Sequence, residues 1–112
     1  MVLLRINFRV DPAHRAKVIR SLARVVGPSR VSAGCMSSRL YADLEDEGRL
    51  LFVEEWSDEQ SLAAHLRAEN TRVLLSAVEY AADPPDVRVE TLADSRGLEF
   101  IAACREAARP GD

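Results

Sequence analysis

One histidine lies in a stretch whose neighbours could form a small reactive site. Residues 51–70, LFVEEWSDEQSLAAHLRAEN, contain an apolar run, then Trp56 and, further on, His65. Leu62, His65 and Leu66 fall at positions i, i+3 and i+4, so a helix would place them on one face. An imidazole titrates near neutral pH and can accept a proton from a substrate. A histidine on an apolar stripe is more often held by hydrogen bonds inside the core than catalytic, so the pattern alone favours a core residue and leaves a catalytic role as the alternative.

Two glutamates lie between the apolar run and Trp56. Successive strand residues point to opposite faces, so Glu54 and Glu55 cannot form a carboxylate pair in one pocket. At most one of them can face the helices that cover the sheet. The pattern does not decide which of the two does so.

Helix boundaries are marked by capping residues and prolines. Ser57 is the expected N-cap of the helix that carries His65, with Gln60 three residues later in a capping box. Asp11 followed by Pro12 predicts the start of an earlier helix, and the sequence Gly27-Pro28 predicts its end near residue 26. Both helices should present an apolar face to a sheet.

The order of predicted elements defines a fold class. Strands are expected over about residues 3–10, 35–43, 50–56 and 87–92, and helices over about 12–26, 58–81 with a break near Asn70, and 95–108. This β-α-β-β-α-β order is ferredoxin-like, an α+β fold. It predicts a four-stranded antiparallel sheet with its helices on one face. Residues 1–93 form one domain, and residues 94–112 add a C-terminal helical extension.

The second strand should alternate between the two faces of this sheet. One face holds Met36, Ser38, Leu40 and Ala42. The opposite face holds Cys35, Ser37, Arg39, Tyr41 and Asp43.

An unbroken apolar run in the third strand predicts a partner. Residues 50–53 are all apolar, so this strand should be buried on both faces. The helices cover only one face. A second copy packed on the open face, in a twofold homodimer, is the simplest cover for the other.

Composition and charge argue against a partner that is nucleic acid, membrane or metal. The net charge of -3 gives no electrostatic footprint for nucleic acid. The N-terminal segment contains Arg5 and Arg9 and no small-residue cleavage site, so we expect neither a signal peptide nor a membrane span, and a cytoplasmic location. Cys35 and Cys104 are 69 positions apart with no CxxC motif, which predicts two free thiols and no metal site.

Several short motifs in this order resemble the antibiotic biosynthesis monooxygenase family. They are Gly-Cys at 34–35, Glu-Glu-Trp at 54–56, Ala-His-Leu at 64–66 and Pro-Pro-Asp-Val at 84–87. The resemblance covers about residues 3–92. It implies a dimeric α+β barrel, with a small apolar pocket between the helices and the sheet of each subunit.

The resemblance also implies a chemistry. Characterised members of the family oxidise quinol-like or polycyclic aromatic substrates with molecular oxygen and use neither metal nor flavin. His65 would then be the proton acceptor for a small aromatic molecule. The candidate substrate-binding residues are Trp56, Phe52, Tyr41, Arg39 and Leu66.

One alternative remains beside this interpretation, and a second, haem degradation, is disfavoured. The polar groups of the predicted pocket are few, so the chain could be a non-catalytic dimeric module that binds a ligand, with Trp56 as a core anchor. Some relatives degrade haem with an asparagine on the first strand and a tryptophan and a histidine on the long helix. Asn7 suits that role by type, but its parity places it opposite Leu4, Ile6 and Phe8, away from the helices.

Overall fold

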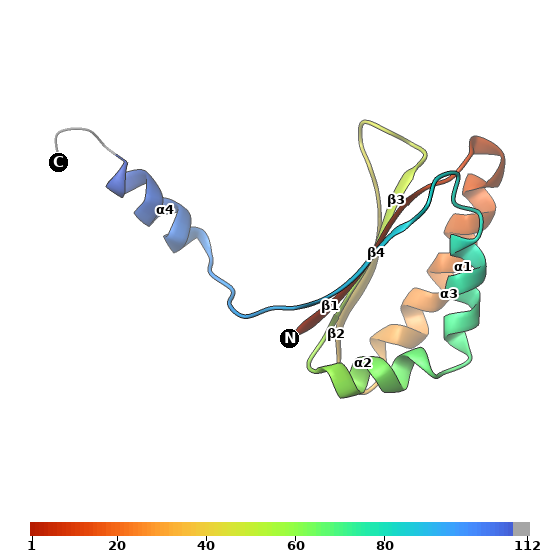
Figure 1. Cartoon of the computed structure of the whole chain (residues 1–112), viewed down its shortest axis with the longest axis horizontal. Helices are drawn as coiled ribbons and strands as arrows, with labels where there is room; N and C mark the ends of the chain where they lie inside the picture. The colour runs from red at the N-terminus through yellow and green to blue at the C-terminus, as the bar shows by residue number, and fades with distance from the viewer. Residues whose placement is uncertain (109–112) are drawn as a thin grey trace.

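The computed structural model describes residues 1–108 and confirms the ferredoxin-like α+β order. The strands are β1 (Val2–Arg9), β2 (Cys35–Ala42), β3 (Arg49–Trp56) and β4 (Asp86–Thr91), and the helices are α1 (Pro12–Arg30), α2 (Glu59–Leu66), α3 (Asn70–Val78) and α4 (Leu98–Ala107). The strands form one antiparallel sheet in the order β2-β3-β1-β4. Helices α1, α2 and α3 lie on one face of it (Figure 1). The predicted C-terminal helix is present as α4, and residues 109–112 of the predicted extension lie outside the described residues.

The core lies between this sheet and α1–α3. Strand β1 alternates as predicted, because every second residue from Val2 to Phe8 is at most 4% exposed and the residues between are not buried. Helix α1 contributes Val18, Leu22 and Val25, each at most 1% exposed. Burial of each such side chain contributes about 1.5–3 kcal/mol, so this layer dominates the stability of the fold.

Helix α1 continues past the predicted end at residue 26. It runs to Arg30 through Gly27 and Pro28, so the predicted boundary was wrong. Proline removes one backbone hydrogen bond from a helix interior. Here Val26 and Ser29 are both buried on either side of Pro28, and their packing holds the last turn in place.

The N-cap of α2 is one residue later than predicted. Asp58, not Ser57, caps the helix, and its Oδ1 accepts a hydrogen bond from the backbone N–H of Ser61 at 2.7 Å. Ser57 instead donates its hydroxyl to Asp58 Oδ2 at 3.2 Å. The hydrogen bond from the Ser61 N–H is the main cause that lowers the pKa of Asp58 below its usual value.

A bulge changes the predicted alternation of β2. Cys35 pairs with Trp56 and Ser37 pairs with Glu55, so the register shifts at Met36. The bulge turns Cys35 toward the helix side, where it packs against the core. The alternation predicted that Cys35 shares a face with Ser37, which was wrong, whereas Ser38 and Leu40 share one face as predicted, and this face is the helix side.

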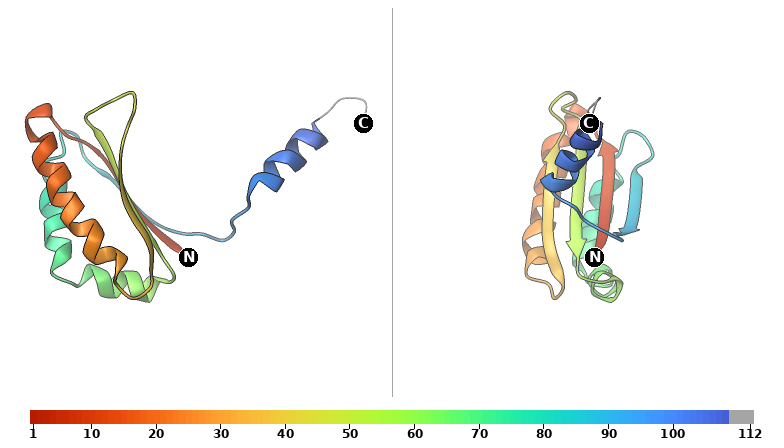
Figure 2. Two further views of the ribbon diagram at one scale, coloured as in Figure 1. Left: turned by 180° about the vertical axis from the view of Figure 1, so that it is seen from behind. Right: turned by 90° about the vertical axis from the view of Figure 1, so that its left-hand side faces the viewer.

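In the part of the chain that the structure describes, residues 1–108, no helix packs on the face of the sheet away from α1–α3. Leu51 and Val53 of β3 lie on this open face and are only partly buried in the single chain. The right-hand view of Figure 2 shows the sheet from this side, with α4 in front of it and α1–α3 behind. Among residues 1–108, no helix combines the length and the apolarity needed to cross a membrane.

Candidate functional site

Glu54 is the glutamate that faces the helices. It shares the helix side of β3 with Phe52 and Trp56, and all three are 0% exposed. Glu55 points to the open face, where its Oε1 accepts a hydrogen bond from the Ser37 hydroxyl at 2.7 Å. A carboxylate in the core needs close polar partners, because burying an unpaired charge is costly.

The carboxylate of Glu54 has three polar neighbours from three elements. The Ser38 hydroxyl of β2 donates to Oε2 at 2.8 Å, and Trp56 Nε1–H donates to Oε1 at 3.3 Å. The third neighbour is His65 of α2, whose Nε2 lies 3.7 Å from Oε1. The two hydrogen bonds fix the orientation of the carboxylate toward the histidine.

His65 lies in the last turn of α2 and is 7% exposed. Its Nε2 is 3.2 Å from Ser29 Oγ on α1, within hydrogen-bonding distance. Its ring stacks on the Trp56 ring, with centroids 4.6 Å apart and planes tilted by 36°. The Thr71 hydroxyl donates to the His65 carbonyl oxygen at 3.3 Å and ties the end of α2 to α3.

These side chains form one connected group, which we call the Glu54–His65 network. Its members are Ser29, Ser38, Glu54, Trp56 and His65. Within residues 1–108, no buried side-chain nitrogen or oxygen lacks a hydrogen-bond partner. A carboxylate beside an imidazole can stabilise the positive charge that forms when the imidazole takes up a proton. The network can therefore support proton transfer, and it also links α1, α2, β2 and β3.

Gly34 sets the position of α2 on the sheet. Its φ is +85°, a region that side-chain-bearing residues rarely adopt, and its carbonyl oxygen accepts the Ser57 N–H at 2.8 Å. A Cβ at this position would lie 2.3 Å from Ser61 Oγ in the first turn of α2. The absence of a side chain at Gly34 thus allows the close approach that places His65 beside the sheet.

The Cys35 thiol adjoins the network. Burial raises its pKa above the ordinary value, and the negative charge of Glu54 raises it further. Cys35 Sγ donates to the Ser37 carbonyl oxygen at 3.5 Å. A raised pKa keeps the thiol protonated and unreactive near neutral pH.

The structure divides the predicted site residues between the two faces of the sheet. Phe52 and Trp56 lie on the helix side with His65, and Leu66 packs against the same core. Arg39 and Tyr41 lie on the open face, opposite Val53 and Leu51 of β3. The structure therefore does not bring Arg39 and Tyr41 into the network.

Sequence reasoning did not identify the two serines of the network. Ser29 and Ser38 are both 0% exposed, yet nothing in their local pattern marks them. The sequence did allow the prediction that Glu54 lies in the same site as Phe52 and Trp56. Phe52 and Trp56 are two residues before and after it, so all three must share a strand face.

A hollow at the edge strand β2 adjoins one member of the network. It has a volume of about 390 Å³ and is lined by Arg30, Met36, Ser37, Ser38 and Arg39. Arg30 Nε donates to the Ser38 carbonyl oxygen at 3.0 Å across this edge. Ser38 thus connects Glu54 on the inside with a polar surface hollow on the outside.

Asn7 occupies the position that its parity predicts. It lies on the open face opposite Leu51, and its Oδ1 accepts a hydrogen bond from Arg49 at 2.9 Å. It is therefore on the other side of the sheet from His65. In residues 1–108 no cluster of three or more His, Cys, Asp or Glu side chains could hold a metal ion.

Sequence comparison matches residues 1–74 to the profile described as antibiotic biosynthesis monooxygenase. An uncharacterized protein of Synechocystis is 24% identical over 93 residues, which are 82% of this chain and 63% of that protein. This chain therefore spans less than two thirds of that relative's length.

Solved structures share the fold. One described as antibiotic biosynthesis monooxygenase has a TM-score of 0.74 at 22% identity, over 84% of this chain and all of the other. The Rv0793 protein of Mycobacterium tuberculosis gives 0.76 at 23% identity, over 86% and 98% of the two chains. The PA3566 protein of Pseudomonas aeruginosa gives 0.70 at 25% identity, over 85% and 94%. The matched fraction of this chain in all three cases is large enough to include the sheet and its helix layer.

Proposed function

Because the chain belongs to the antibiotic biosynthesis monooxygenase family, we propose that it oxidises a small aromatic or quinol-type substrate with molecular oxygen. The proposed reaction uses neither metal nor flavin. The observation that carries it is the buried pair of His65 and Glu54, whose Nε2 and Oε1 atoms are 3.7 Å apart beside the Trp56 ring. This arrangement offers a proton acceptor next to an aromatic surface.

His65 acts as the general base in this proposal. Its imidazole accepts a proton from an acidic C–H or O–H of the substrate, and the Glu54 carboxylate stabilises the imidazolium. Ser38 and Trp56 hold the carboxylate in place through the hydrogen bonds at 2.8 Å and 3.3 Å. The protein thereby favours the electron-rich anion of the substrate, which can donate an electron to oxygen.

The oxidation of a ring methylene to a carbonyl needs no other reductant. The substrate carbanion transfers one electron to oxygen, and the two radicals combine to form a C–O bond. The imidazolium of His65 returns its proton to the peroxide. Loss of water then breaks the O–O bond and the second C–H bond, so that CH₂ and O₂ become C=O and H₂O.

The proposed substrate site lies between α2 and the sheet. Phe52, Trp56 and Leu66 provide its apolar wall, where exclusion of water favours both the stacking of an aromatic ring and transfer of the proton to His65. Phe52 and Trp56 are 0% exposed, so a ligand must displace α2 from the sheet to reach them. Residues 67–69, which separate α2 from α3, provide a short connection at which α2 can move.

The proposal includes a homodimer formed through the open face. Leu51 and Val53 are partly exposed there, and Tyr41 is 49% exposed. Two charged pairs, Arg5 with Glu90 and Arg88 with Asp86, already neutralise part of this face. Sedimentation at micromolar concentration tests the dimer, and a stable monomer would contradict it.

A ligand-binding module without turnover is the second candidate function. The observation in its favour is that the network is closed, because Nε2 of His65 already lies 3.2 Å from Ser29 Oγ and 3.7 Å from Glu54 Oε1. In this case His65 is a structural core residue. The same fold would bind an aromatic compound without oxidising it.

Oxygen consumption with a panel of hydroquinones and anthrones separates these functions. The chain has two histidines, so the exposed His14 provides a matched control for His65. We expect His65→Ala to reduce the rate by about 10²–10⁴-fold, the usual contribution of a general base, and His14→Ala to leave it unchanged. Equal rates for the parent and His65→Ala would remove His65 from the mechanism. Saturable quenching of the single Trp56 without oxygen uptake would instead identify a binding module.

A further inference from the structure

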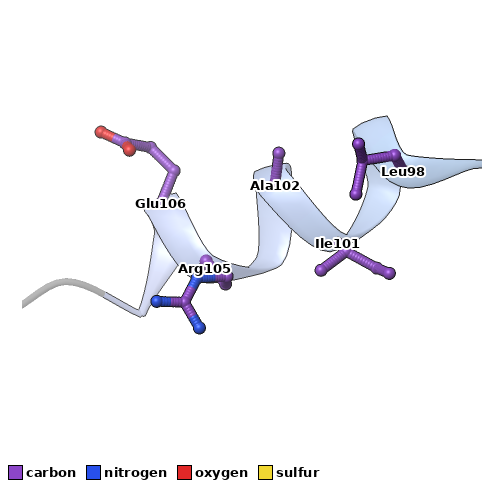
Figure 3. Close-up of a pocket in the computed structure, with 5 residues that line it drawn as sticks. All are labelled: Leu98, Ile101, Ala102, Arg105 and Glu106. Atoms are coloured by element: carbon purple, nitrogen blue, oxygen red, sulfur yellow. The ribbon is translucent and has the colours of Figure 1, made fainter.

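Helix α4 is exposed along its whole length within residues 1–108. None of its residues is buried, and its large apolar side chains Leu98, Phe100 and Ile101 are 76%, 42% and 55% exposed. Figure 3 shows the side chains of Leu98, Ile101, Ala102, Arg105 and Glu106, which all belong to α4 and border an open space beside this helix. An isolated helix of ten residues is marginal in water. Its apolar side therefore needs a surface supplied from elsewhere.

Helix α4 extends away from the rest of the chain. The radius of gyration is 17.3 Å, whereas a compact chain of this length has about 13 Å. Figures 1 and 2 show α4 extending away from the sheet on the side of the open face, opposite α1–α3. This is the side that a second copy would occupy in the sheet-face dimer.

On the helix side of the sheet, strand β4 has exposed apolar side chains that α4 of another copy could cover. Val87 and Val89 pair with Ile6 and Leu4, so they point to the same side as those core residues. Ile6 and Leu4 are 3% exposed, but Val87 and Val89 are 52% and 56% exposed. Helices α1–α3 therefore leave this edge of the sheet uncovered.

An apolar hollow at the end of α3 precedes this edge. It has a volume of about 570 Å³ and is lined by Leu75, Val78, Glu79, Ala81, Ala82, Asp83, Pro84 and Pro85. We call these residues, with Val87 and Val89, the β4 strip. Its acidic residues are Glu79 and Asp83. The side of α4 that holds Leu98 and Ile101 ends at Arg105, with Glu106 next to it, so its apolar side chains can meet the apolar lining of the strip and its guanidinium can meet a carboxylate there.

We propose that α4 of each copy docks on the β4 strip of a second copy of this chain. The inference rests on the sheet-face dimer proposed above. A partner sheet on the open face brings the partner's helix layer to the side on which α4 stands. Twofold symmetry makes the contact twice, and each α4 then completes the helix layer of the other subunit. The Arg105 guanidinium of one copy pairs with the carboxylate of Glu79 or Asp83 in the other copy. This ion pair sets the direction in which α4 lies along the strip.

Disulfide trapping in the full chain tests this contact. Cys104 of α4 follows Phe100 and Ile101 by four and three positions, so it lies on their side of the helix. Val87→Cys supplies a thiol on the strip, and Ala23→Cys on the exposed surface of α1 is the matched control. Because a disulfide needs Cα atoms within about 7 Å, oxidation should form a covalent dimer at least about tenfold faster in Val87→Cys than in the control. Adding Cys104→Ser should abolish this dimer.

Three results would overturn the proposal, and sedimentation of the same samples separates them. A disulfide within one chain would mean that α4 folds back on its own β4. A dimer in sedimentation that forms no disulfide with Val87→Cys would leave the sheet-face dimer in place but remove the exchange of α4. A monomer in sedimentation would contradict both, whatever the oxygen-uptake assay gives for His65.

Discussion

The Glu54–His65 network and helix α4 represent opposite extremes of packing in this chain. In the network, α1, α2, β2 and β3 meet so that the buried Glu54 carboxylate has three polar neighbours within one subunit. Helix α4 has ten residues, and none of them is buried. The first region is complete within one chain, whereas the second depends on a further surface. Site chemistry and assembly are therefore separable by mutation.

Replacing one aromatic side chain in each region should show this difference most strongly. Trp56→Ala removes a side chain that is 0% exposed and should lower the free energy of unfolding by about 3–5 kcal/mol. Phe100→Ala removes a side chain that is 42% exposed and contacts the Arg96 guanidinium at 3.9 Å. Its cost in the single chain should be below about 1 kcal/mol. Urea unfolding of both variants at one low protein concentration measures this, and equal costs would contradict the comparison.

Two glycines give a second test with a smaller expected effect. Gly34→Ala forces a Cβ within 2.3 Å of Ser61 Oγ at a φ of +85°, and should cost about 1–3 kcal/mol. Gly27→Ala in α1 meets nothing within 4 Å, and should stabilise the chain by about 0.5–1 kcal/mol. Thermal unfolding compares them. A neutral Gly34→Ala would show that the approach of α2 does not depend on this glycine.

The carboxylate of the network should make a measurable contribution of its own. Glu54→Gln keeps the shape but replaces one acceptor oxygen by a donor, and should cost about 1–3 kcal/mol because Ser38 or Trp56 loses its acceptor. The double variant with His65→Ala should cost less than the sum of the single variants, since the two side chains share the network. Urea unfolding of the four proteins gives the interaction energy. Strict additivity would mean that Glu54 and His65 act independently.

Hydrophobic alternation and turn signals were sufficient to predict the sheet and its helix layer. The alternation of β1 and the helical spacing of Leu62, His65 and Leu66 follow directly from burial on one face, and the structure confirms both. The positions at which the prediction was wrong depend on packing between distant elements. Burial of Ser29 carries α1 through Pro28, and the bulge at Met36 exists only in the pairing of β2 with β3.

The candidate site was predictable only in part for the same reason. His65 and Trp56 were identified because their types are unusual at those positions in the sequence. Ser29 is 36 positions away from His65 and has no distinctive local signal. The assignment of Arg39 and Tyr41 to the same pocket needed the register of β2 on β3, which places them on the open face. Local patterns do not determine that register.

The two cysteines provide the smallest test of the comparison. Burial and then the charge of Glu54 raise the pKa of the Cys35 thiol, whereas Cys104 on α4 is exposed. A higher pKa means a smaller thiolate fraction at a given pH, so at a protein concentration low enough to keep the chain monomeric Cys35 should react with Ellman's reagent more slowly at pH 7–8 than Cys104. Glu54→Gln should lower the pKa of Cys35 and speed its reaction without affecting Cys104. Equal rates for the two thiols in the parent would contradict the packing described for β2.

Oxidation under ¹⁸O₂ tests the central claim, that the network supports oxygen transfer, most directly. The proposed reaction places one oxygen atom of O₂ in the product carbonyl and the other in water. We expect mass spectrometry of the product to show one ¹⁸O per oxidised methylene with the parent chain and with His14→Ala, and a loss of labelled product with His65→Ala. Unlabelled product, or equal labelling with His65→Ala, would contradict the assignment of His65 and its network.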